Sequence, residues 1–478
     1  MSPNTIIHTA VDVAAVEALL VRQKADWRAQ GGLDYARRRA LLRGLDDALA
    51  RRQDELTAAM SQDFGNRHLR ESEIYELYPL RAELRYVLRH LKGWMRPRRA
   101  HVRWPFLPSS GWVVPQPRGV VGVIGAWNYP LLLTVLPIIS AIAAGNRVIV
   151  KAPRLAPHSM ALLAEIFAAL APSEILALVQ PSPAVDAAFP GLPFNHLVFS
   201  GSTRTGRSVA RMAARNLTPV TLSLSGKSPA IVAPGYDPAA AARAIVAGKL
   251  VNAGQTCIAP DYCLVPAVSL EAFVAAAKAA VHNLYPQGLH DPGYTHVPEP
   301  SLRTRLDELV ADAEAKGAQS WWSGPAPEAG FGAAPFPPVL LWDVHPGMAC
   351  MEDEIFGPVL PIVAYEHLAE AADFVRDRPA PLALYWFDID QPRARRETAK
   401  IPAGGVGINA VLVHAAQPEL PFGGIGESGI GQYRGRYGFQ RLSHMQGVYR
   451  NASRATGWVQ PPYGGFARRL MALLLRWG

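Results

Sequence analysis

The spacing of apolar residues predicts helices through the first hundred positions. Apolar side chains return at intervals of three, four or seven residues, which places them on one face of a helix. They are Val13, Val16, Leu20 and Trp27 in the first helix, Leu42, Leu49 and Leu56 in the second, and those within 74–91 in the third. Gly31-Gly32 would end the first helix, and Pro97 follows the third. The chain therefore opens with a helical lead.

From residue 119 the pattern changes to short apolar runs that alternate with helical segments. A strand at 119–124, a helix at 131–144 and a strand at 147–151 form a βαβ unit, which predicts parallel strands. Further strands are expected at 176–179, 196–199, 221–224 and 230–232. A second α/β region should extend from about Gly226 to Leu420. Residues 417–445 are rich in glycine and read as irregular, and 324–338 as a surface loop.

The composition fits a folded protein of two or three domains. The chain has 478 residues, of which 49% are hydrophobic and 18% charged, enough for a large core and unlike a disordered chain. A net charge of +9 raises the question of nucleic acid, but the arginines are scattered along helices and no nucleic-acid module occurs, so we expect no such partner. Three cysteines make no disulfide framework, which favours a reducing cytoplasm. We recognise neither a signal peptide nor a stretch of spanning length.

The segment Asn252-Ala253-Gly254-Gln255-Thr256-Cys257 is the most informative for chemistry. Its glycine would let the backbone turn tightly against a ligand. The cysteine could then face a pocket as a nucleophile. A lone cysteine is as readily a small buried hydrophobe, so the hexapeptide alone leaves both interpretations open.

Three other segments suggest a ligand site. Trp127-Asn128-Tyr129-Pro130 follows the first strand, where Asn128 could donate to an oxyanion or merely satisfy a turn. The loop from Gly201 to Gly206 lies between a strand and a helix, a context that binds phosphate. Glu354 and Phe356 would project to one side of an extended segment, which could also be a plain strand end. The stretch 424–429 has the dinucleotide spelling GxGxxG, but no suitable strand precedes it, so we interpret it as a loop.

In this order the four segments resemble the aldehyde dehydrogenase superfamily, over about residues 10–460. The sequence is most similar to the class-3-like branch of coniferyl and fatty aldehyde dehydrogenases in 255–262, 379–385, 420–424, 431–433 and Ser443-His444. The resemblance implies a Rossmann-like α/β cofactor domain, an α/β catalytic domain and a small β oligomerisation element. Their expected ranges are 1–102 with 122–225, 226–419, and 103–121 with 420–460, followed by a tail at 461–478.

The resemblance also implies roles for individual residues. Cys257 would be the nucleophile, and Asn128 with the backbone N–H of Cys257 would bind the oxyanion. Lys151 would meet the adenine ribose and Glu354 the nicotinamide ribose. The remaining assignments are cofactor contacts by Trp127, Gly201, Ser202, Gly206 and Phe356, and substrate contacts by Tyr129 and Phe422. The implied reaction is oxidation of an aromatic or medium-to-long aliphatic aldehyde to the acid with NAD or NADP, through a thiohemiacetal and a thioester, with no metal.

One departure from the family concerns the base. The family's Leu-Glu-Leu-Gly-Gly-Lys-Ser-Pro reads Leu222-Ser223-Leu224-Ser225-Gly226-Lys227-Ser228-Pro229 here, so Ser223 occupies the catalytic position of the general-base glutamate. A serine cannot accept a proton near neutral pH without its own base, and a base supplies roughly 10²–10⁴-fold in rate. Glu354 is the first candidate to substitute. Transfer of the acyl group to a thiol such as CoA, or a turnover-deficient protein that only binds cofactor or aldehyde, remain alternatives.

A second departure follows Lys151. The family places a glutamate three residues later, whereas this chain has Arg154. An arginine can pair with a 2′-phosphate that a carboxylate would repel, so the sequence predicts that NADP is accepted and could be preferred.

The C-terminal tail combines apolar residues with Arg468, Arg469 and Arg476. Its apolar run is about half the ~20 residues needed to span a membrane, so contact with a membrane surface and a helix that caps the substrate funnel are both open. The resemblance implies a homodimer.

Overall fold

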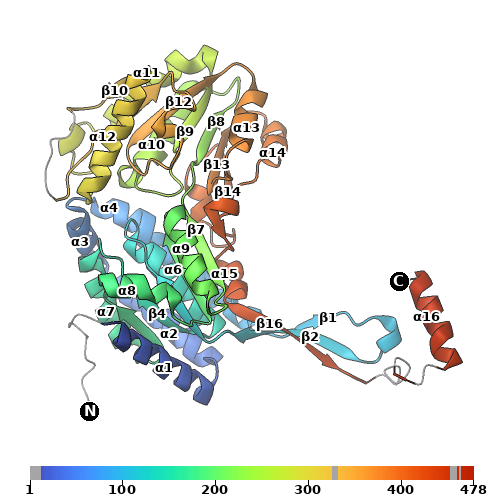
Figure 1. The fold of residues 1–478 in the computed structure, drawn as a ribbon. Helices are drawn as coiled ribbons and strands as arrows, with labels where there is room; N and C mark the ends of the chain where they lie inside the picture. Colours follow the sequence, from blue (N-terminus) through green and yellow to red (C-terminus); the bar gives the residue numbers. More distant parts are fainter. Residues whose placement is uncertain (1–11, 326–331, 453–459, 462–463, 478) are drawn as a thin grey trace.

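The computed structural model describes residues 12–325, 332–452, 460–461 and 464–477. Figure 1 shows two α/β bodies stacked one above the other and a thin β arm that leaves the lower body sideways. Three sheets of six, seven and three strands belong to the lower body, the upper body and the arm respectively. The predicted α/β fold with a small β element is therefore confirmed.

The lower body is built on a six-stranded sheet in the order β15-β7-β6-β3-β4-β5. The strands are β3 (Val120–Ile124), β4 (Arg147–Lys151), β5 (Leu176–Val179), β6 (His196–Gly201), β7 (Val220–Leu224) and β15 (Gly429–Ile430). All neighbours are parallel except β15, which pairs antiparallel with β7. Every residue of β3 and β4 is buried, because helices cover both faces of a parallel sheet. The five strands predicted for this region are present.

Nine α-helices among the described residues surround this sheet. They are α1 (Val13–Gln30), α2 (Tyr35–Arg51), α3 (Gln53–Phe64), α4 (Leu69–Ser72), α5 (Tyr78–Trp94), α6 (Pro130–Ala144), α7 (Pro157–Leu170), α8 (Pro183–Ala188) and α9 (Thr203–Ala214). The predicted second helical face is divided between two helices, since the chain leaves helical geometry at Arg52. Leu49 and Leu56 are nevertheless both fully buried. The apolar spacing thus identified the core residues but not the break.

Helix α6 is a core helix despite its apolar length. Pro137 lies inside it, and fourteen of its fifteen residues are buried. The helix begins at Pro130, two residues after Asn128, so the buried helix fixes the position of the loop that carries Asn128. No helix among the described residues is both long enough and apolar enough to cross a membrane.

The upper body contains a seven-stranded sheet in the order β10-β11-β12-β9-β8-β13-β14. The strands are β8 (Pro229–Val232), β9 (Tyr262–Pro266), β10 (Gln319–Trp322), β11 (Val339–Trp342), β12 (Val359–Tyr365), β13 (Ala383–Phe387) and β14 (Gly405–Ile408). The helices are α10 (Pro238–Leu250), α11 (Leu270–Leu284), α12 (Pro300–Ala315), α13 (Leu368–Arg376) and α14 (Gln391–Thr398). The predicted loop at 324–338 includes 326–331, which lie outside the described residues; its described part holds no helix and only an isolated bridge.

The arm consists of three antiparallel strands, β1 (Arg98–Ala100), β2 (Ser110–Pro117) and β16 (Ser443–Arg450). Strand β16 pairs with β2 along its whole length, from Ser443 opposite Pro117 to Arg450 opposite Ser110. The expectation of irregular chain at 417–445 is wrong in part, because α15 (Gly435–Arg441), β15 and the start of β16 lie there. Glycine-rich composition conceals strands whose partners are hundreds of residues away.

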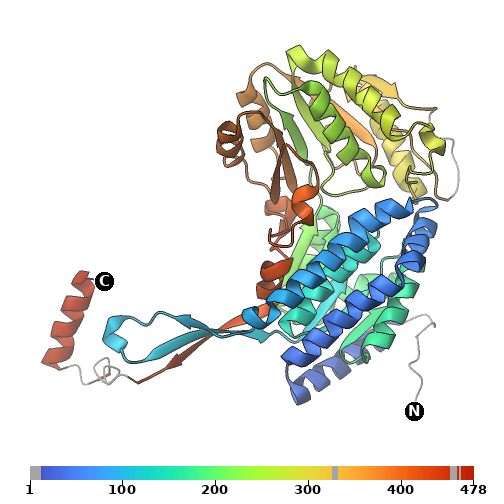
Figure 2. The ribbon, with the colours of Figure 1, turned by 180° about the vertical axis from the view of Figure 1, so that it is seen from behind.

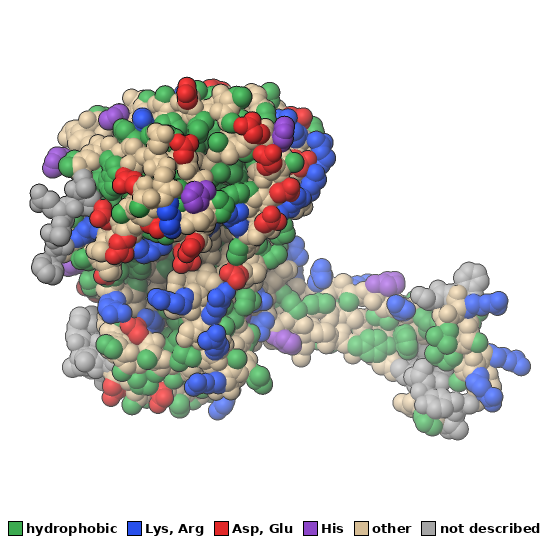
Figure 3. Space-filling model, turned by 45° about the horizontal axis from the view of Figure 1, so that its top comes forward, with side chains coloured by type: hydrophobic (Ala, Val, Ile, Leu, Met, Phe, Trp, Pro, Cys, Tyr) green, Lys and Arg blue, Asp and Glu red, His purple; other side chains and the backbone are tan. Residues whose placement is uncertain are grey.

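Helix α16 (Gly465–Trp477) stands beside the outer end of the arm in both views of Figures 1 and 2, away from the two bodies. Its apolar side chains include the exposed Phe466, Leu473 and Leu475. The arm also carries exposed apolar side chains, and Figure 3 shows such side chains along its surface. They include Trp104, Leu107, Val448 and Tyr449.

Candidate active site

A cleft of about 1060 Å³ runs over the carboxyl ends of the lower strands and is closed on one side by loops of the upper body. Open α/β sheets bind ligands at this edge. The cleft brings together ten of the predicted residues, namely Trp127, Asn128, Lys151, Arg154, Gly201, Ser202, Ser223, Cys257, Glu354 and Phe356. Gly206, Tyr129 and Phe422 are absent from the described lining.

The cysteine loop is held by an unusual backbone conformation. Asn252, Ala253 and Gly254 have φ angles of 55°, 50° and 75°, in the left-handed region. A Cβ on Gly254 would lie 2.2 Å from the carbonyl oxygen of Gly357. We expected this glycine to let the backbone approach a ligand, but it admits the neighbouring loop instead. The loop of Cys257 is therefore pressed against the loop of Glu354.

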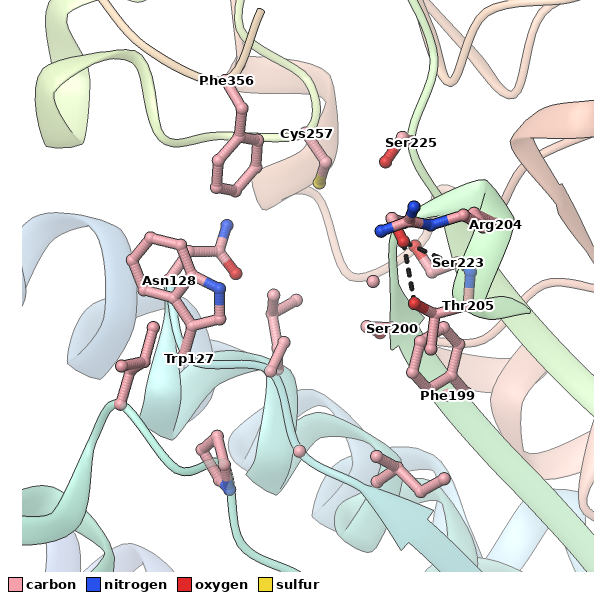
Figure 4. Close-up of a pocket in the computed structure, with 18 of the residues that line it drawn as sticks. Trp127, Asn128, Phe199, Ser200, Arg204, Thr205, Ser223, Ser225, Cys257 and Phe356 are labelled. Atoms are coloured by element: carbon pink, nitrogen blue, oxygen red, sulfur yellow. Dashed lines mark hydrogen bonds between the residues drawn. The ribbon is translucent and has the colours of Figure 1, made fainter. Parts of the chain in front are cut away.

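Cys257 presents its thiol to the cleft. Figure 4 shows the sulfur pointing into the space between Asn128 and Ser223. Burial and, after it, the nearby Glu354 carboxylate raise the pKa of Cys257 to about 12. Cys263 and Cys350 are fully buried and outside the described lining of the cleft. The thiol is thus protonated in the free protein and needs a proton acceptor before it can react.

Glu354 is the acid of the cleft wall whose charge acts on this thiol. Burial and, after it, the charge of Asp261 raise the pKa of Glu354 to about 8, against a hydrogen bond with Ser225. Its loop is fixed through the backbone, because Arg305 donates to the Glu354 carbonyl at 2.6 Å and Asp261 accepts from Ile355 N at 3.1 Å. A carboxyl group of this kind changes its proton near neutral pH, as a general base should.

Behind Glu354 lies a buried charge cluster that sequence reasoning missed. Asp261 pairs with Lys227 at 2.5 Å and lies 3.6 Å from Lys249, whose ammonium group makes no hydrogen bond among the described residues. Burial lowers the pKa of Lys249. Lys249 belongs to α10, whereas Lys227 and Asp261 lie in the segments directly before β8 and β9.

Asn128 is joined to the cysteine loop by hydrogen bonds in both directions. Its Nδ2 donates to the Gln255 carbonyl at 3.0 Å, and Asn252 Nδ2 donates to the Asn128 carbonyl at 2.9 Å. An amide group has two donor hydrogens, so one remains for a ligand. Figure 4 shows the amide at the edge of the space before Cys257.

Tyr129 was assigned to the substrate, and the structure corrects this. The residue is 5% exposed, and its hydroxyl is 2.6 Å from Thr256 Oγ1, underneath the cysteine loop. The ring packs against the Arg67 guanidinium, 5.0 Å from its centroid. A tyrosine directly after Asn128 is turned inward because the chain enters α6 at Pro130. Tyr129 therefore supports the loop from behind and is absent from the described lining of the cleft.

A second buried charge cluster connects the N-terminal helices to the start of α6 and to the cysteine loop. Arg67 pairs with Glu76 at 2.5 Å and with Glu71 at 3.3 Å, and all three side chains are nearly or fully buried. Glu76 accepts from the backbone N–H groups of Leu131 and Leu132 at the start of α6, while Glu71 accepts from Asn252 N at 3.1 Å. Charged residues inside an amphipathic helical face were the only sequence signal for this cluster.

Ser223 lies on β7 at the floor of the cleft and opposite Ser200 of β6. Tyr433 is next to both serines, and burial raises its pKa to about 12, so the phenol stays protonated and cannot replace the missing base. Phe422 forms a bridge with Tyr433, with ring centroids 5.6 Å apart, and is 7% exposed. We predicted that Phe422 lines the substrate path, but the residue is absent from the described lining of the cleft. Its ring packs in the core instead.

The opposite end of the cleft suits a dinucleotide. Ser202 caps α9 by accepting from Thr205 N at 3.3 Å, which leaves the helix N-terminus at the cleft. A Cβ on Gly206 would lie 2.3 Å from the Leu224 side chain, so this glycine serves helix-to-strand packing. Trp127 and Phe356 form an aromatic pair with ring centroids 5.7 Å apart. Arg204, to which the sequence gave no role, also reaches the cleft in Figure 4.

Lys151 is the last residue of β4 and forms an ion pair with Asp186 of α8, a residue that the sequence did not indicate. Arg154 Nη2 lies 3.7 Å from the other carboxylate oxygen. Among the described residues, no three His, Cys, Asp or Glu side chains are arranged to hold a metal ion.

The chain is similar to known proteins over most of its length. Residues 6–448 match the model of the aldehyde dehydrogenase family. A probable coniferyl aldehyde dehydrogenase of Pseudomonas aeruginosa is 41% identical over 462 residues, 96% of each chain, and a coniferyl aldehyde dehydrogenase of Pseudomonas sp. is 37% identical over 438 residues, 90% of this chain and 91% of that one. The substrate-bound structure of Staphylococcus aureus AldH has a TM-score of 0.90 at 31% identity, and covers 96% of this chain and 99% of that chain.

Proposed function

The chain belongs to the aldehyde dehydrogenase family, and from this premise we propose that it oxidises coniferyl-type aromatic aldehydes with Cys257 as nucleophile and Glu354 as proton acceptor. Its general activity is that of an NAD(P)-dependent aldehyde dehydrogenase that forms the carboxylic acid. The relatives do not favour the thiol-transfer and turnover-deficient alternatives. The observation that carries the proposed roles is the meeting of Cys257, Asn128 and Glu354 in one cleft.

In the first half-reaction the Cys257 sulfur attacks the aldehyde carbon, and the thiol proton moves to Glu354. The carbonyl oxygen becomes an oxyanion within reach of the free Asn128 hydrogen and the Cys257 backbone N–H. The bound nicotinamide supplies the hydride acceptor. Lys151 and the N-terminus of α9 would hold the rest of the dinucleotide. Two observations support this assignment: the cap residue Ser202 is exposed, and Gly206 lets α9 pack closely on β7.

In the second half-reaction water attacks the Cys257 thioester and loses a proton to a base. The hydroxyl group of Ser223 cannot accept this proton without a base of its own, and the raised pKa of Tyr433 keeps that phenol protonated. Glu354, with a pKa of about 8, is a carboxylate in about a tenth of the molecules at pH 7 and in about half of them at pH 8. Glu354 must therefore give the thiol proton to solvent through the cleft before water attacks. The proton that it then takes from water passes to the departing Cys257 sulfur, so release of the acid returns the thiol and one proton in total leaves to solvent.

The substrate class rests on the relatives. Three of them, 41%, 39% and 37% identical, are named as coniferyl aldehyde dehydrogenases or probable ones. Initial rates of coniferyl aldehyde and of a saturated aldehyde of similar length would test this. We expect kcat/KM for coniferyl aldehyde to exceed that of the saturated aldehyde, and the reverse order would refute the aromatic assignment.

The proton-acceptor role is tested by Glu354→Gln, with the absorbance of reduced nicotinamide followed in a single turnover and at steady state. We expect a loss of roughly 10²–10⁴-fold at steady state. A matched control is Asp353→Asn, the exposed neighbour on the same loop. Wild-type turnover by Glu354→Gln would overturn the assignment. Ser223→Glu should restore part of the lost rate if a carboxylate is what the site needs.

We also propose a cytoplasmic homodimer. The exposed apolar side chains of the arm, which include Trp104 and Leu107, support an interface there. Sedimentation of the wild type against Trp104→Ser should show a shift toward monomer. Contact of the tail with a membrane, or with a substrate funnel, stays a prediction; deletion of 466–478 should alter vesicle binding or long-chain aldehyde use.

A further inference from the structure

We propose that Asp186 sets the preference between NAD and NADP, by supplying from α8 the carboxylate that meets the ribose of the adenosine half. The inference rests on the cofactor site proposed above, with Lys151 at the ribose. It changes the expectation drawn from Arg154 alone, because it assigns opposite charges to two residues of one subsite.

Three charged side chains meet at this end of the cleft. Asp186 pairs with Lys151 through one carboxylate oxygen, and its second oxygen lies 3.7 Å from Arg154 Nη2. All three line the cleft. The side chains of Lys151 and Asp186 are 11% and 25% exposed, whereas that of Arg154 is 76% exposed. Lysine and aspartate are thus held in place, and arginine is free to move in solvent.

The topology explains why the carboxylate comes from α8. Strand β5 pairs with β4 so that Val179 lies opposite Lys151. The chain then turns through Ser182, which caps α8, and brings Asp186 back to the end of β4. The segment directly after Lys151, Ala152-Pro153-Arg154, contains no acid. Asp186 therefore supplies from a different element what a local acid would otherwise provide.

The chemistry of the two cofactors differs at one group. The ribose of NAD offers hydroxyl hydrogens, which a carboxylate accepts, and hydroxyl oxygens, to which Lys151 donates. The 2′-phosphate of NADP brings negative charge to the same place and would be repelled by Asp186. Arg154 can offset this repulsion only by turning from Asp186 to the phosphate. We therefore expect both cofactors to bind, with NAD preferred.

The ion pair with Lys151 could instead have a purely structural purpose. The two side chains are only 11% and 25% exposed, so the pair can also contribute to folding. The two explanations differ in one readout. A structural acid changes the affinity for both cofactors by the same factor, whereas a discriminating acid changes their ratio.

The experiment measures dissociation constants of NAD and NADP for the full chain without aldehyde, by quenching of tryptophan fluorescence. For Asp186→Asn we expect weaker NAD binding and tighter NADP binding, so that the ratio of the two constants moves toward NADP by on the order of tenfold or more. For Arg154→Ala the ratio should move the other way. The exposed Glu174→Gln, before β5, is the matched control and should leave both constants unchanged.

Thermal denaturation of each variant checks that it is folded, and Asp186→Ser serves if Asp186→Asn is not. A ratio that stays within twofold in a folded Asp186 variant overturns the proposal, as does equal weakening of both cofactors. Failure of the wild type to bind either cofactor would instead contradict the cofactor site itself. Wild-type turnover by Glu354→Gln, with the cofactor ratio shifted as expected in Asp186→Asn, would overturn only the catalytic assignment, so the two failures are distinguishable.

Discussion

The two ends of the cleft are built on different principles. At the thiol end, Cys257, Asn128 and Glu354 stand on loops held by backbone contacts and by charges buried in the core. At the adenosine end, Lys151 ends β4, Arg154 follows it in a turn and Asp186 lies on the short helix α8, and the exposure of the three side chains ranges from 11% to 76%. The difference indicates that reaction geometry depends on many distant residues, while cofactor choice depends on a few local charges.

The largest effect should come from the nucleophile itself. Cys257→Ala should lower kcat by roughly 10⁴-fold or more, since the nucleophile acts as one unit with its partners. NAD affinity should change little, because the adenosine end is untouched. The control is Cys350→Ala, which removes a buried thiol outside the described lining and should retain turnover per folded molecule. Wild-type activity in Cys257→Ala would show that Cys257 is not the nucleophile, and the thiol end of the cleft would then not be the site of reaction.

The buried cluster beneath the thiol end should respond next. Glu76→Gln leaves the Arg67 charge without its 2.5 Å partner, and we expect a loss of about 3–5 kcal/mol in the free energy of unfolding. Urea denaturation measures it. Glu73→Gln, an acid of the same turn that pairs with the exposed Arg70, should cost about 0–1 kcal/mol. Equal losses in the two variants would mean that the buried Arg67–Glu76 pair contributes no more to stability than the surface Arg70–Glu73 pair.

The oxyanion donor tests whether rate and binding separate. Asn128→Ala should lower kcat by about 10²–10³-fold, as for other single donors of this kind. Asn216→Ala, whose amide donates to the Gly191 carbonyl at the surface, is the control and should have no effect. An Asn128→Ala enzyme with raised KM and normal kcat would place this residue in binding rather than in stabilising the oxyanion.

The pH profile should reflect the acid of the thiol end. The required form of Glu354 is the carboxylate, so kcat should rise with pH up to its pKa of about 8 and level above it. Below that pKa the rate should fall by about tenfold per pH unit. Glu354→Gln should flatten this limb, while Asp186→Asn should leave it in place. Persistence of the limb in Glu354→Gln would assign it to another group.

The smallest effect is expected at the phosphate loop. Ser202→Ala removes the cap of α9, a change of about 1 kcal/mol, and should weaken NAD and NADP by the same few-fold factor. Titration of both cofactors measures it. Asp237→Ala removes the cap of α10, far from the cleft, and should lower stability without changing cofactor affinity.

The sequence predicted five of the six strands of the lower sheet, and ten of the thirteen candidate site residues line the cleft, because apolar runs and strand-end loops are local patterns. It could not indicate Asp186, Glu71 or Glu76. Asp186 reaches the cleft, and the two glutamates reach the backbone of α6 and of the cysteine loop, only through folding of distant segments. Tyr129 and Phe422 were misplaced for a related reason. Their positions beside functional residues were correct, but a neighbour in sequence can point to the opposite side of a loop.

The contact between Gly254 and Gly357 links the two halves of the reaction mechanically. The carbonyl oxygen of Gly357 occupies the space that a side chain at residue 254 would fill, so the cysteine segment and the carboxylate loop are in direct contact. We expect a ligand that displaces Phe356 to shift the cysteine segment as well. Alkylation of Cys257 by iodoacetamide should therefore act as a gauge of cofactor occupancy, with a rate that changes when the aromatic wall is engaged.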